Sequence, residues 1–579
     1  MENNKEQLEK IRHSLAHLLA SAVLKIDPEA KLAIGPAVEN GFYYDFDLSK
    51  KFEEKNLRKL EKEMRKLISQ KLDFIKEEIS KPEAKKLFTD QPYKLELLGD
   101  LENPIIYRTG DFTDLCEGPH IKNTSEINPD AFKLTKIAGA YWKGDEKNKM
   151  LTRIYGVAFE KKNDLDEYLK MLEETKKRDH RKIGKEMDLF VFSDLVGPGL
   201  PLFTPKGVVI KDELQKHIEK VCRGYGFQKV STPHLAKIEL FEISGHAQKF
   251  AGELFHVKSH YKQQYVLKPV QCPHQTQIYA SRPRSYRDLP IRYMESEKQY
   301  RDEKPGQISG LQRVLAITVE DGHSFCRVGQ VKEEVKNMIK IIRDFYTGLG
   351  LWGKHWVSLS VRDYKRPENY IGDPKDWDIC EKMLTDICEE MNLGAKKREG
   401  EAALYGPKID FMFEDNLGRE IQIPTVQLDF ATPKKFGLTY TNEKGESEPP
   451  VMVHRAILGS YERFMMLLIE HFAGAFPLWL APVQVKVLPI SDKHKKYAQE
   501  IYKKLFERDF RVEIDLDDES LGKKIRRAKL EKIPHLLILG DKEMESQNIT
   551  VENRDAGNLG QFSLDDLIEK IGQEIKNKK

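Results

Sequence analysis

Residues 291–326, which read IRYMESEKQYRDEKPGQISGLQRVLAITVEDGHSFC, constrain the fold more than any other segment of the chain. They contain an Arg-x-Glu turn (Arg301 and Glu303) and a second arginine, Arg313, on a returning strand that the apolar alternation after it predicts. Two arginines on facing strands of a hairpin can bind phosphate, because each planar guanidinium donates parallel hydrogen bonds. A solvated charged hairpin fits the same pattern, so the segment alone leaves both interpretations open.

The length of 579 residues exceeds one hydrophobic core and predicts three or four domains at about 150 residues each. Lys and Arg (96) nearly balance Asp and Glu (93), so net charge neither requires nor excludes a nucleic-acid partner. Six cysteines without a paired framework predict a reducing, cytoplasmic location. No segment has the apolar run of a membrane span or a signal peptide, so we expect no membrane partner.

Two pairs of potential metal ligands or bases lie near the N-terminus. Residues 7–25 have helical apolar spacing, and His13 and His17, four residues apart, project from one face of that helix. Cys116 and His120 are also four apart, in a Gly-Pro segment that favours a loop. The two pairs could therefore converge on one pocket.

Four further segments outline the domain organisation. Residues 51–72 alternate acidic and basic side chains and predict a solvated helix, and residues 161–186 predict a helical connector. Residues 208–235 predict a long helix and a strand that stops at Pro233. From residue 482 onward strands and helices alternate, which predicts a small α/β domain with a mostly parallel sheet.

Three blocks occur in the order found in class II aminoacyl-tRNA synthetases: the helix and strand ending at Pro233, the Arg-x-Glu segment, and a turn at Gly459 before an arginine helix with Arg463. Together with Cys272, His323 and His454, they make the chain resemble the bacterial-type threonyl-tRNA synthetases over nearly its whole length.

The resemblance implies an α/β and α+β multidomain protein. An N-terminal α+β editing domain (1–160) and the connector (161–186) would precede a class II catalytic domain (187–478), whose antiparallel sheet is flanked by helices. A small α/β anticodon-binding domain (479–579) would follow. The implied activity is ligation of L-threonine to tRNA(Thr) with ATP, with hydrolysis of mischarged seryl-tRNA(Thr).

In the implied catalytic site, Arg301 binds the α-phosphate of ATP and Glu303 the adenine amino group. Arg313 and Arg463 bind the outer phosphates, and magnesium enters with ATP. Adenylate formation needs positioning and charge stabilisation of the phosphate, and it needs no separate general base.

The resemblance also implies one zinc ion per subunit in the catalytic domain, held by Cys272, His323 and His454. Three protein ligands leave the metal open to a substrate. In the family the metal takes the amino group and the hydroxyl of threonine, and valine, which lacks the hydroxyl, cannot complete this shell. The positions that line this pocket in the family correspond to Asp321, Tyr405, Gln422 and Gln427.

Serine keeps the hydroxyl and lacks only a methyl group, a difference worth roughly 10- to 200-fold, so a second, hydrolytic site is expected. The resemblance assigns that site to His13, His17, Cys116 and His120, with Lys94, Tyr44 and Asp114 as helpers, and leaves its metal content open. In the C-terminal domain, Glu545 and Arg554 match positions that contact anticodon bases.

This sequence departs from the family pattern in two ways. The small N-terminal domain that many relatives carry is not expected before the editing helix, and Ile317 and Val319 replace a stacking aromatic and a glutamine, which would alter substrate affinity. Residues 208–235 would pair two copies as a homodimer. Two alternatives to the ligase are a catalytically impaired RNA-binding paralogue and a zinc hydrolase acting through the N-terminal four-residue site.

Overall fold

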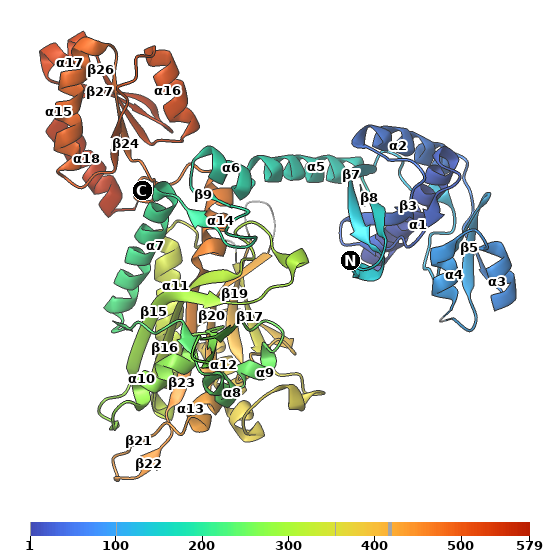
Figure 1. Ribbon diagram of the computed structural model, residues 1–579, viewed down its shortest axis with the longest axis horizontal. Coiled ribbons are helices and arrows are strands. Elements are labelled where there is room, and N and C mark those ends of the chain that lie inside the picture. The colour runs from blue at the N-terminus through green and yellow to red at the C-terminus, as the bar shows by residue number, and fades with distance from the viewer. Residues whose placement is uncertain (1, 100, 354, 415–419, 579) are drawn as a thin grey trace. The chain divides into compact units, whose positions relative to one another are not determined.

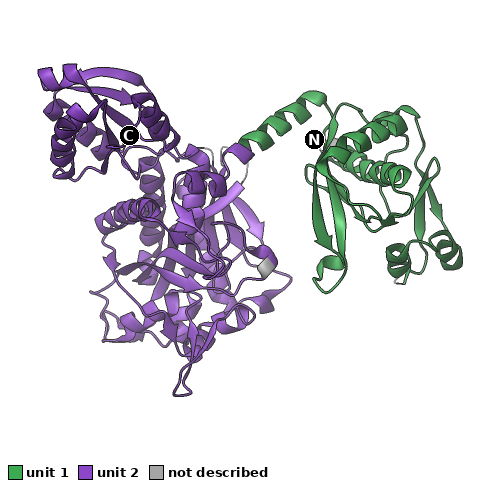
Figure 2. Ribbon diagram, turned by 45° about the horizontal axis from the view of Figure 1, so that its top comes forward, with its two compact units in different colours: residues 1–174 green, residues 175–579 purple. Residues whose placement is uncertain are grey.

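A computed structural model of the protein describes residues 2–99, 101–353, 355–414 and 420–578. The chain divides into two compact units, residues 1–174 and residues 175–579, which Figure 2 draws in green and purple. Among the described residues, we find no helix whose length and apolar character would let it cross a membrane.

Unit 1 is built on helix α1 (Glu2–Ile26) and an antiparallel sheet. The strand order is β1-β3-β8-β7, and β2 pairs with the start of β3 along the same edge as β1. Leu15, Leu19 and Val23 of α1 are fully buried against the sheet. The strands are β1 (Lys31–Leu32), β2 (Ala37–Val38), β3 (Gly41–Asp47), β7 (Phe132–Tyr141) and β8 (Met150–Ala158). The expected helix over residues 7–25 therefore forms the centre of this core.

Helix α2 (Glu54–Ser69) corrects the expectation of a solvated helix over residues 51–72. Its residues Leu57, Leu60, Met64 and Leu67 recur at helical spacing and are buried in the core of unit 1. The dense alternation of charge belongs to the outer face and obscures an apolar stripe. The helix thus covers the core rather than spanning solvent.

A second, three-stranded sheet in unit 1 carries the segment before Cys116. Its order is β4-β5-β6, with β4 (Ile75–Glu78), β5 (Ile105–Thr109) and β6 (Phe112–Leu115). Two short helices, α3 (Lys81–Leu87) and α4 (Pro92–Leu98), accompany it. Cys116 to His120 form the loop that follows β6, as the Gly-Pro sequence predicts.

Unit 2 contains an eight-stranded sheet in the order β11-β15-β16-β23-β20-β19-β17-β18. The strands from β15 to β17 pair antiparallel, and the edge strands β11 and β18 pair parallel with their neighbours. The strand bounds are β11 (Gln228–Lys229), β15 (Ile291–Tyr300), β16 (Ala316–Cys326), β23 (Val451–Ser460), β20 (Glu420–Asp429), β19 (Lys408–Glu414), β17 (His355–Val361) and β18 (Lys396–Glu399). This confirms the predicted antiparallel sheet flanked by helices (Figure 1).

Helices α7 (Pro205–Gly224), α11 (Val331–Gly348), α12 (Pro374–Glu390) and α14 (Tyr461–Phe472) share the main apolar core with this sheet. The strand after α7 is shorter than predicted. It consists of Gln228–Lys229, and beyond it Val230 still donates its backbone N–H to Met294, but no regular strand reaches Pro233.

The junction between β23 and α14 depends on glycine. Gly459 has φ +65°, which an L side chain rarely adopts, and it lies in a β-bulge where β23 slips against β16. Ser460 then caps α14 by accepting the backbone N–H of Arg463 at 3.2 Å. The bulge at Gly459 thus turns the chain from β23 into the helix that carries Arg463.

A buried ion pair links strands β16 and β23. Arg455 of β23 is 1% exposed and pairs with Glu320 of β16. Its guanidinium runs under Gly322, where a Cβ atom would lie 2.7 Å from the guanidinium carbon. Glycine at position 322 therefore leaves the space that Arg455 occupies.

The last part of unit 2 is a five-stranded sheet in the order β25-β24-β26-β27-β28. Strands β25 (Val512–Ile514), β24 (Val485–Pro489) and β26 (His535–Leu539) are parallel. Strands β27 (Ile549–Asn553) and β28 (Gly557–Phe562) are antiparallel, joined by a short turn instead of a helix. The small α/β domain is confirmed, whereas the expectation of a mostly parallel sheet is wrong.

The segment predicted to be a helical connector, residues 161–186, forms two helices. Helix α5 (Lys162–Lys177) is followed by α6 (His180–Glu186), and Asp179 caps α6 by accepting the backbone N–H of Arg181. Gly474, after α14, could not carry a Cβ without meeting Met187 and Ile183, so α6 packs closely on that segment.

Replacing Leu468 with alanine tests the packing of α14. Leu468 is fully buried, so Leu468→Ala should lower the free energy of unfolding by about 2–5 kcal/mol. The matched control is Leu530→Ala, because Leu530 is 68% exposed and should change stability by less than about 0.5 kcal/mol. Urea unfolding followed by circular dichroism measures both. Equal midpoints for the two variants would contradict the assigned core.

Candidate functional site

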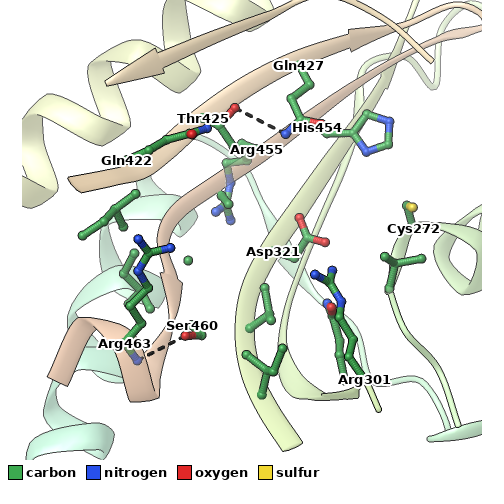
Figure 3. A pocket seen from close by; sticks show the side chains of 18 of the residues that line it. Cys272, Arg301, Asp321, Gln422, Thr425, Gln427, His454, Arg455, Ser460 and Arg463 are labelled. Carbon is green, nitrogen blue, oxygen red and sulfur yellow. Dashed lines mark hydrogen bonds between the residues drawn. The ribbon is translucent and has the colours of Figure 1, made fainter. Parts of the chain in front are cut away.

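A cavity of about 300 Å³ lies on one face of the eight-stranded sheet (Figure 3). Strand β16 contributes Ile317, Val319 and Asp321 to its wall. The intervening Thr318 points to the other face and donates to Glu462 of α14. The alternation of β16 therefore gives one face to the cavity and the other to the helices.

Strand register brings the predicted Cys/His/His triad together. His323 on β16 pairs directly with His454 on β23, and their ring centroids are 4.7 Å apart. Cys272 is the first residue of α10 (Cys272–Ala280). One ligand atom from each of the three lies within 4.8 Å of the others, and all three residues are buried.

The surroundings of the triad fit a metal ion. Nδ1 of His323 lies 2.8 Å from Gln275, and the buried Nε2 has no hydrogen-bond partner among the described residues. Nε2 of His454 lies 3.0 Å from the carboxylate of Asp429. In each histidine one ring nitrogen is held by a neighbour and the other is left as a ligand, the arrangement typical of metal-bound imidazoles.

The protonation states of these groups are also compatible with binding of a cation. Burial lowers the pKa of His323, so its imidazole is neutral and can donate a lone pair. Burial raises the pKa of the Cys272 thiol, and a bound cation would reverse that effect. Burial, with a contribution from Glu320, raises the pKa of Asp321 to about 8. A cation in the cavity would favour its charged form.

Arg301 and Arg463 line the same cavity (Figure 3). The Arg301 guanidinium lies over the ring of Phe250, 4.7 Å from its centroid, and its Nε has no hydrogen-bond partner in the described part of the chain. Arg463 is in the first turn of α14, above the Ser460 cap. Two guanidinium groups therefore reach a buried space that can hold an anion.

Glu303 and Arg313 occupy the loop between β15 and β16 rather than the cavity wall. Arg313 donates to Oε2 of Glu303 from Nε at 2.8 Å and from Nη2 at 2.6 Å. The expectation that Arg313 lies on the returning strand is wrong, because ladder pairing stops at Tyr300 and Ala316. The intervening glycines favour the loop.

Tyr405, Gln422 and Gln427 line the cavity with Asp321, and the structure brings all four together. The Tyr405 ring stacks on His454 at 4.5 Å, and its hydroxyl donates to Gln427 at 2.6 Å. Gln427 pairs directly with His454 across the sheet.

Sequence reasoning missed three residues of this site: His246, Gln275 and Asp429. His246 lines the cavity, and burial lowers its pKa to about 3, so it is neutral. Gln275 could have been found from its position three residues after Cys272, on the same helix face. Asp429 lies on β20, whose register against His454 is a tertiary property.

In unit 1, the seven residues predicted for the second site lie together. Sγ of Cys116 lies 3.3 Å from Nε2 of His13 and 3.4 Å from Nε2 of His120. The His17 ring is 4.2 Å from that of His120. Helix α1 and the loop after β6 therefore form one cluster.

Asp114 organises the remaining residues of this cluster. Its carboxylate accepts the hydroxyl of Tyr44 at 2.7 Å and lies 2.5 Å from Nζ of Lys94. Nε2 of His17 is 3.5 Å away. Burial lowers the pKa values of His13, His17 and His120 and raises that of Cys116 to about 11, so the cluster consists of neutral bases and a thiol.

Glu545 and Arg554 lie at opposite ends of β26. Glu545 is exposed on α17 (Asp541–Ser546), which follows that strand. Arg554 lies beside Pro534, before the strand, and its guanidinium donates to the carbonyls of Phe476 and Lys532 and to Asp555. The structure does not bring the two side chains together.

Comparison with known families covers most of the chain. Residues 255–472 match the model of the tRNA synthetase class II core domain (G, H, P, S and T), and residues 484–574 match the anticodon binding domain. Residues 106–155 match the threonyl and alanyl tRNA synthetase second additional domain.

Two solved structures are similar in fold to this chain. The RNA binding domain of threonyl-tRNA synthetase from Cryptosporidium parvum has TM-score 0.65 and 33% identity, covering 68% of this chain and 98% of that one. A putative threonyl-tRNA synthetase from Aeropyrum pernix has TM-score 0.62 and 26% identity, covering 69% and 97%.

Relatives that match over nearly the whole chain have a higher sequence identity to it than these two solved structures have. The threonine–tRNA ligase of Thermotoga sp. is 45% identical over 99% of this chain and 89% of its own length. That of Gloeobacter violaceus is 46% identical over 96% and 90%. The chain therefore belongs to the threonine–tRNA ligase family of class II aminoacyl-tRNA synthetases.

Proposed function

We propose that the protein ligates L-threonine to tRNA(Thr) through threonyl adenylate, and hydrolyses mischarged seryl-tRNA(Thr). The observation that carries the proposal is that Arg301 and Arg463 line one cavity together with Cys272 and His454, two members of the Cys/His/His triad. Full-length similarity to threonine–tRNA ligases supports it.

Activation requires an oxygen of the threonine carboxylate to attack the α-phosphate of ATP in line, as pyrophosphate leaves on the opposite side. In this proposal Arg301 stabilises the α-phosphate and Arg463 the outer phosphates, with magnesium bound to the nucleotide. Arg313 assists at the outer phosphates. Both of its hydrogen bonds to Glu303 use Oε2, so Oε1 can accept from the adenine amino group.

The proposed resident metal is one zinc ion per subunit on Cys272, His323 and His454. When bound, zinc would supply a Lewis-acidic position for the amino group and hydroxyl of threonine. Asp321, Tyr405, Gln422 and Gln427 orient the substrate from the surrounding wall. A substrate lacking the hydroxyl leaves these polar groups unpaired, which can be rejected by about 10⁴-fold or more.

Serine requires the second site, because one methyl group gives too little discrimination. We assign hydrolysis of seryl-tRNA to the cluster in unit 1, where neutral His13 and His17 can orient or activate water. Asp114 holds Tyr44 and Lys94 in place. The proposed domains are 1–160 for editing, 161–186 for the connector, 187–478 for catalysis and 479–579 for anticodon binding.

Glu545 is proposed to accept hydrogen bonds from an anticodon base, and Arg554 to reach a different base only after leaving its carbonyl partners.

All six cysteines are unpaired, which supports a reducing, cytoplasmic location. The alternatives, an impaired RNA-binding paralogue or a zinc hydrolase, leave the polar residues of the central cavity without a role.

The two chemistries should separate by unit. Arg301→Ala should abolish threonine-dependent ATP–pyrophosphate exchange while deacylation of added seryl-tRNA(Thr) persists. The double variant His13→Ala, His17→Ala should keep exchange and threonyl-tRNA formation near the parent level but accumulate seryl-tRNA. Each variant controls for the folding of the other. If the double variant clears pre-charged seryl-tRNA at the parent rate, unit 1 does not contain the editing site.

Elemental analysis should find one zinc ion per chain in protein purified without chelator. Cys272→Ala should lose it and lose threonine activation, because two imidazoles alone bind zinc more weakly. Cys116→Ala is the matched control and should retain the zinc of the catalytic domain. A parent protein without zinc, or unaltered activation in Cys272→Ala, would refute the metal site.

We also expect a C2 homodimer. The segment before and at the start of α7 exposes large apolar side chains, including Phe192 (44%), Leu195 (100%) and Val208 (40%). Light scattering should give about twice the 67.2 kDa chain mass. Val208→Asp should shift the population toward monomer. A parent mass of one chain at micromolar concentration would exclude the dimer.

A further inference from the structure

His180, the first residue of α6, contacts two elements that carry ATP-site arginines. It is 5% exposed. Nδ1 lies 2.8 Å from Oε1 of Glu470 on α14, and Nε2 lies 3.1 Å from the backbone N of Leu311, which donates to it. Only a neutral imidazole with its proton on Nδ1 satisfies both bonds, because a carboxylate accepts and a backbone N–H donates.

On one side, His180 holds the tip of the loop from residue 301 to residue 315. Arg301 donates its backbone N–H to Leu315 at the base of this loop, and Ser309 and Arg313 form a bridge around the tip. Leu311 lies inside that bridge and is fully buried. A displacement of Leu311 would therefore be transmitted to Arg313 and, through the closed base, to Arg301.

On the other side, His180 is bonded to the helix that carries Arg463. Glu470 lies about two helical turns after Arg463 on α14. Arg178, two residues before His180, donates to the carbonyls of Glu470 and His471 at the end of the same helix. The start of α6 thus fixes the end of α14.

The fit around His180 is tight. Gly310 has φ +48°, and a Cβ atom there would lie 2.3 Å from Nε2 of His180. A side chain at position 310 would displace either the imidazole or the loop tip. This glycine is what allows the loop to approach the ring.

We propose that His180 is a positioning residue for ATP: it ties the loop bearing Arg301 and Arg313 to the helix bearing Arg463, and so sets the spacing of the three guanidinium groups. The inference rests on the proposed function. It adds a residue that does not line the cavity and acts on nucleotide affinity through the elements that carry the arginines.

Two substitutions separate the two bonds of the imidazole. In His180→Asn the amide can still donate to Glu470, but no acceptor reaches Leu311. In His180→Gln the longer amide can present its oxygen to Leu311. His180→Asn should raise KM for ATP in ATP–pyrophosphate exchange roughly tenfold, with KM for threonine within about twofold of the parent. His180→Gln should restore part of the ATP affinity. Lys182→Ala, an exposed change on the same helix, is the control and should alter neither constant.

Gly310→Ala provides a second test that leaves His180 in place. It should raise KM for ATP, and combining it with His180→Asn should add little, because both changes release the same contact. Unchanged KM for ATP in His180→Asn and in Gly310→Ala would overturn the proposal. A fall in kcat with both KM values unchanged, matched by a lower midpoint of unfolding, would overturn it too, since it indicates a merely structural role. Absence of exchange in the parent would instead refute the proposed function.

Discussion

The register of three adjacent strands, β16, β23 and β20, is the constraint on which the central site depends. His323 faces His454 across one pair of strands, and His454 faces Gln427 across the next. Side chains alternate between sheet faces, so a slip of one residue would turn a ligand into the core. The site therefore needs a sheet whose register cannot drift. The β-bulge at Gly459 and the fully buried opposite face both oppose such drift.

On the opposite face of the sheet, polar groups as well as apolar ones oppose a shift of strand register. Thr318 bonds Glu462 of α14, and Glu320 pairs with Arg455, all in the layer between sheet and helices. Nε and Nη2 of Arg455 have no hydrogen-bond partner among the described residues. A buried ion pair contributes little net stability, but a misplaced register would separate its charges at a cost of several kcal/mol. The pair thus adds specificity of alignment to the hydrophobic core.

Residue chemistry in the sequence was sufficient to predict much of the two sites. Spacing alone placed His13 and His17 on one helix face, and resemblance supplied Cys272, His323 and His454 as a set. The neighbours that complete each site were harder to predict. Asp429 reaches His454 through strand pairing, and sequence separation of 25 residues carries no signal of that contact. Arg313 lies in a loop and not on the predicted strand, because apolar alternation in a sequence does not mark where the hydrogen-bonded pairing of two strands ends. Charge alternation in α2 concealed an apolar stripe, since the periodicity of one face can mask that of the other.

The space beneath Gly322 links two positions that are far apart in the chain. Arg455 fills the volume that a side chain at position 322 would need, and Glu320 keeps the guanidinium from moving aside. Neither position can therefore vary freely in descendants of this protein. A larger residue at 322 becomes tolerable only after 455 has shortened, and a shorter 455 leaves a void until 322 has grown. Positions 322 and 455 should therefore change together during evolution, so that the order in which substitutions arise decides which lineages persist.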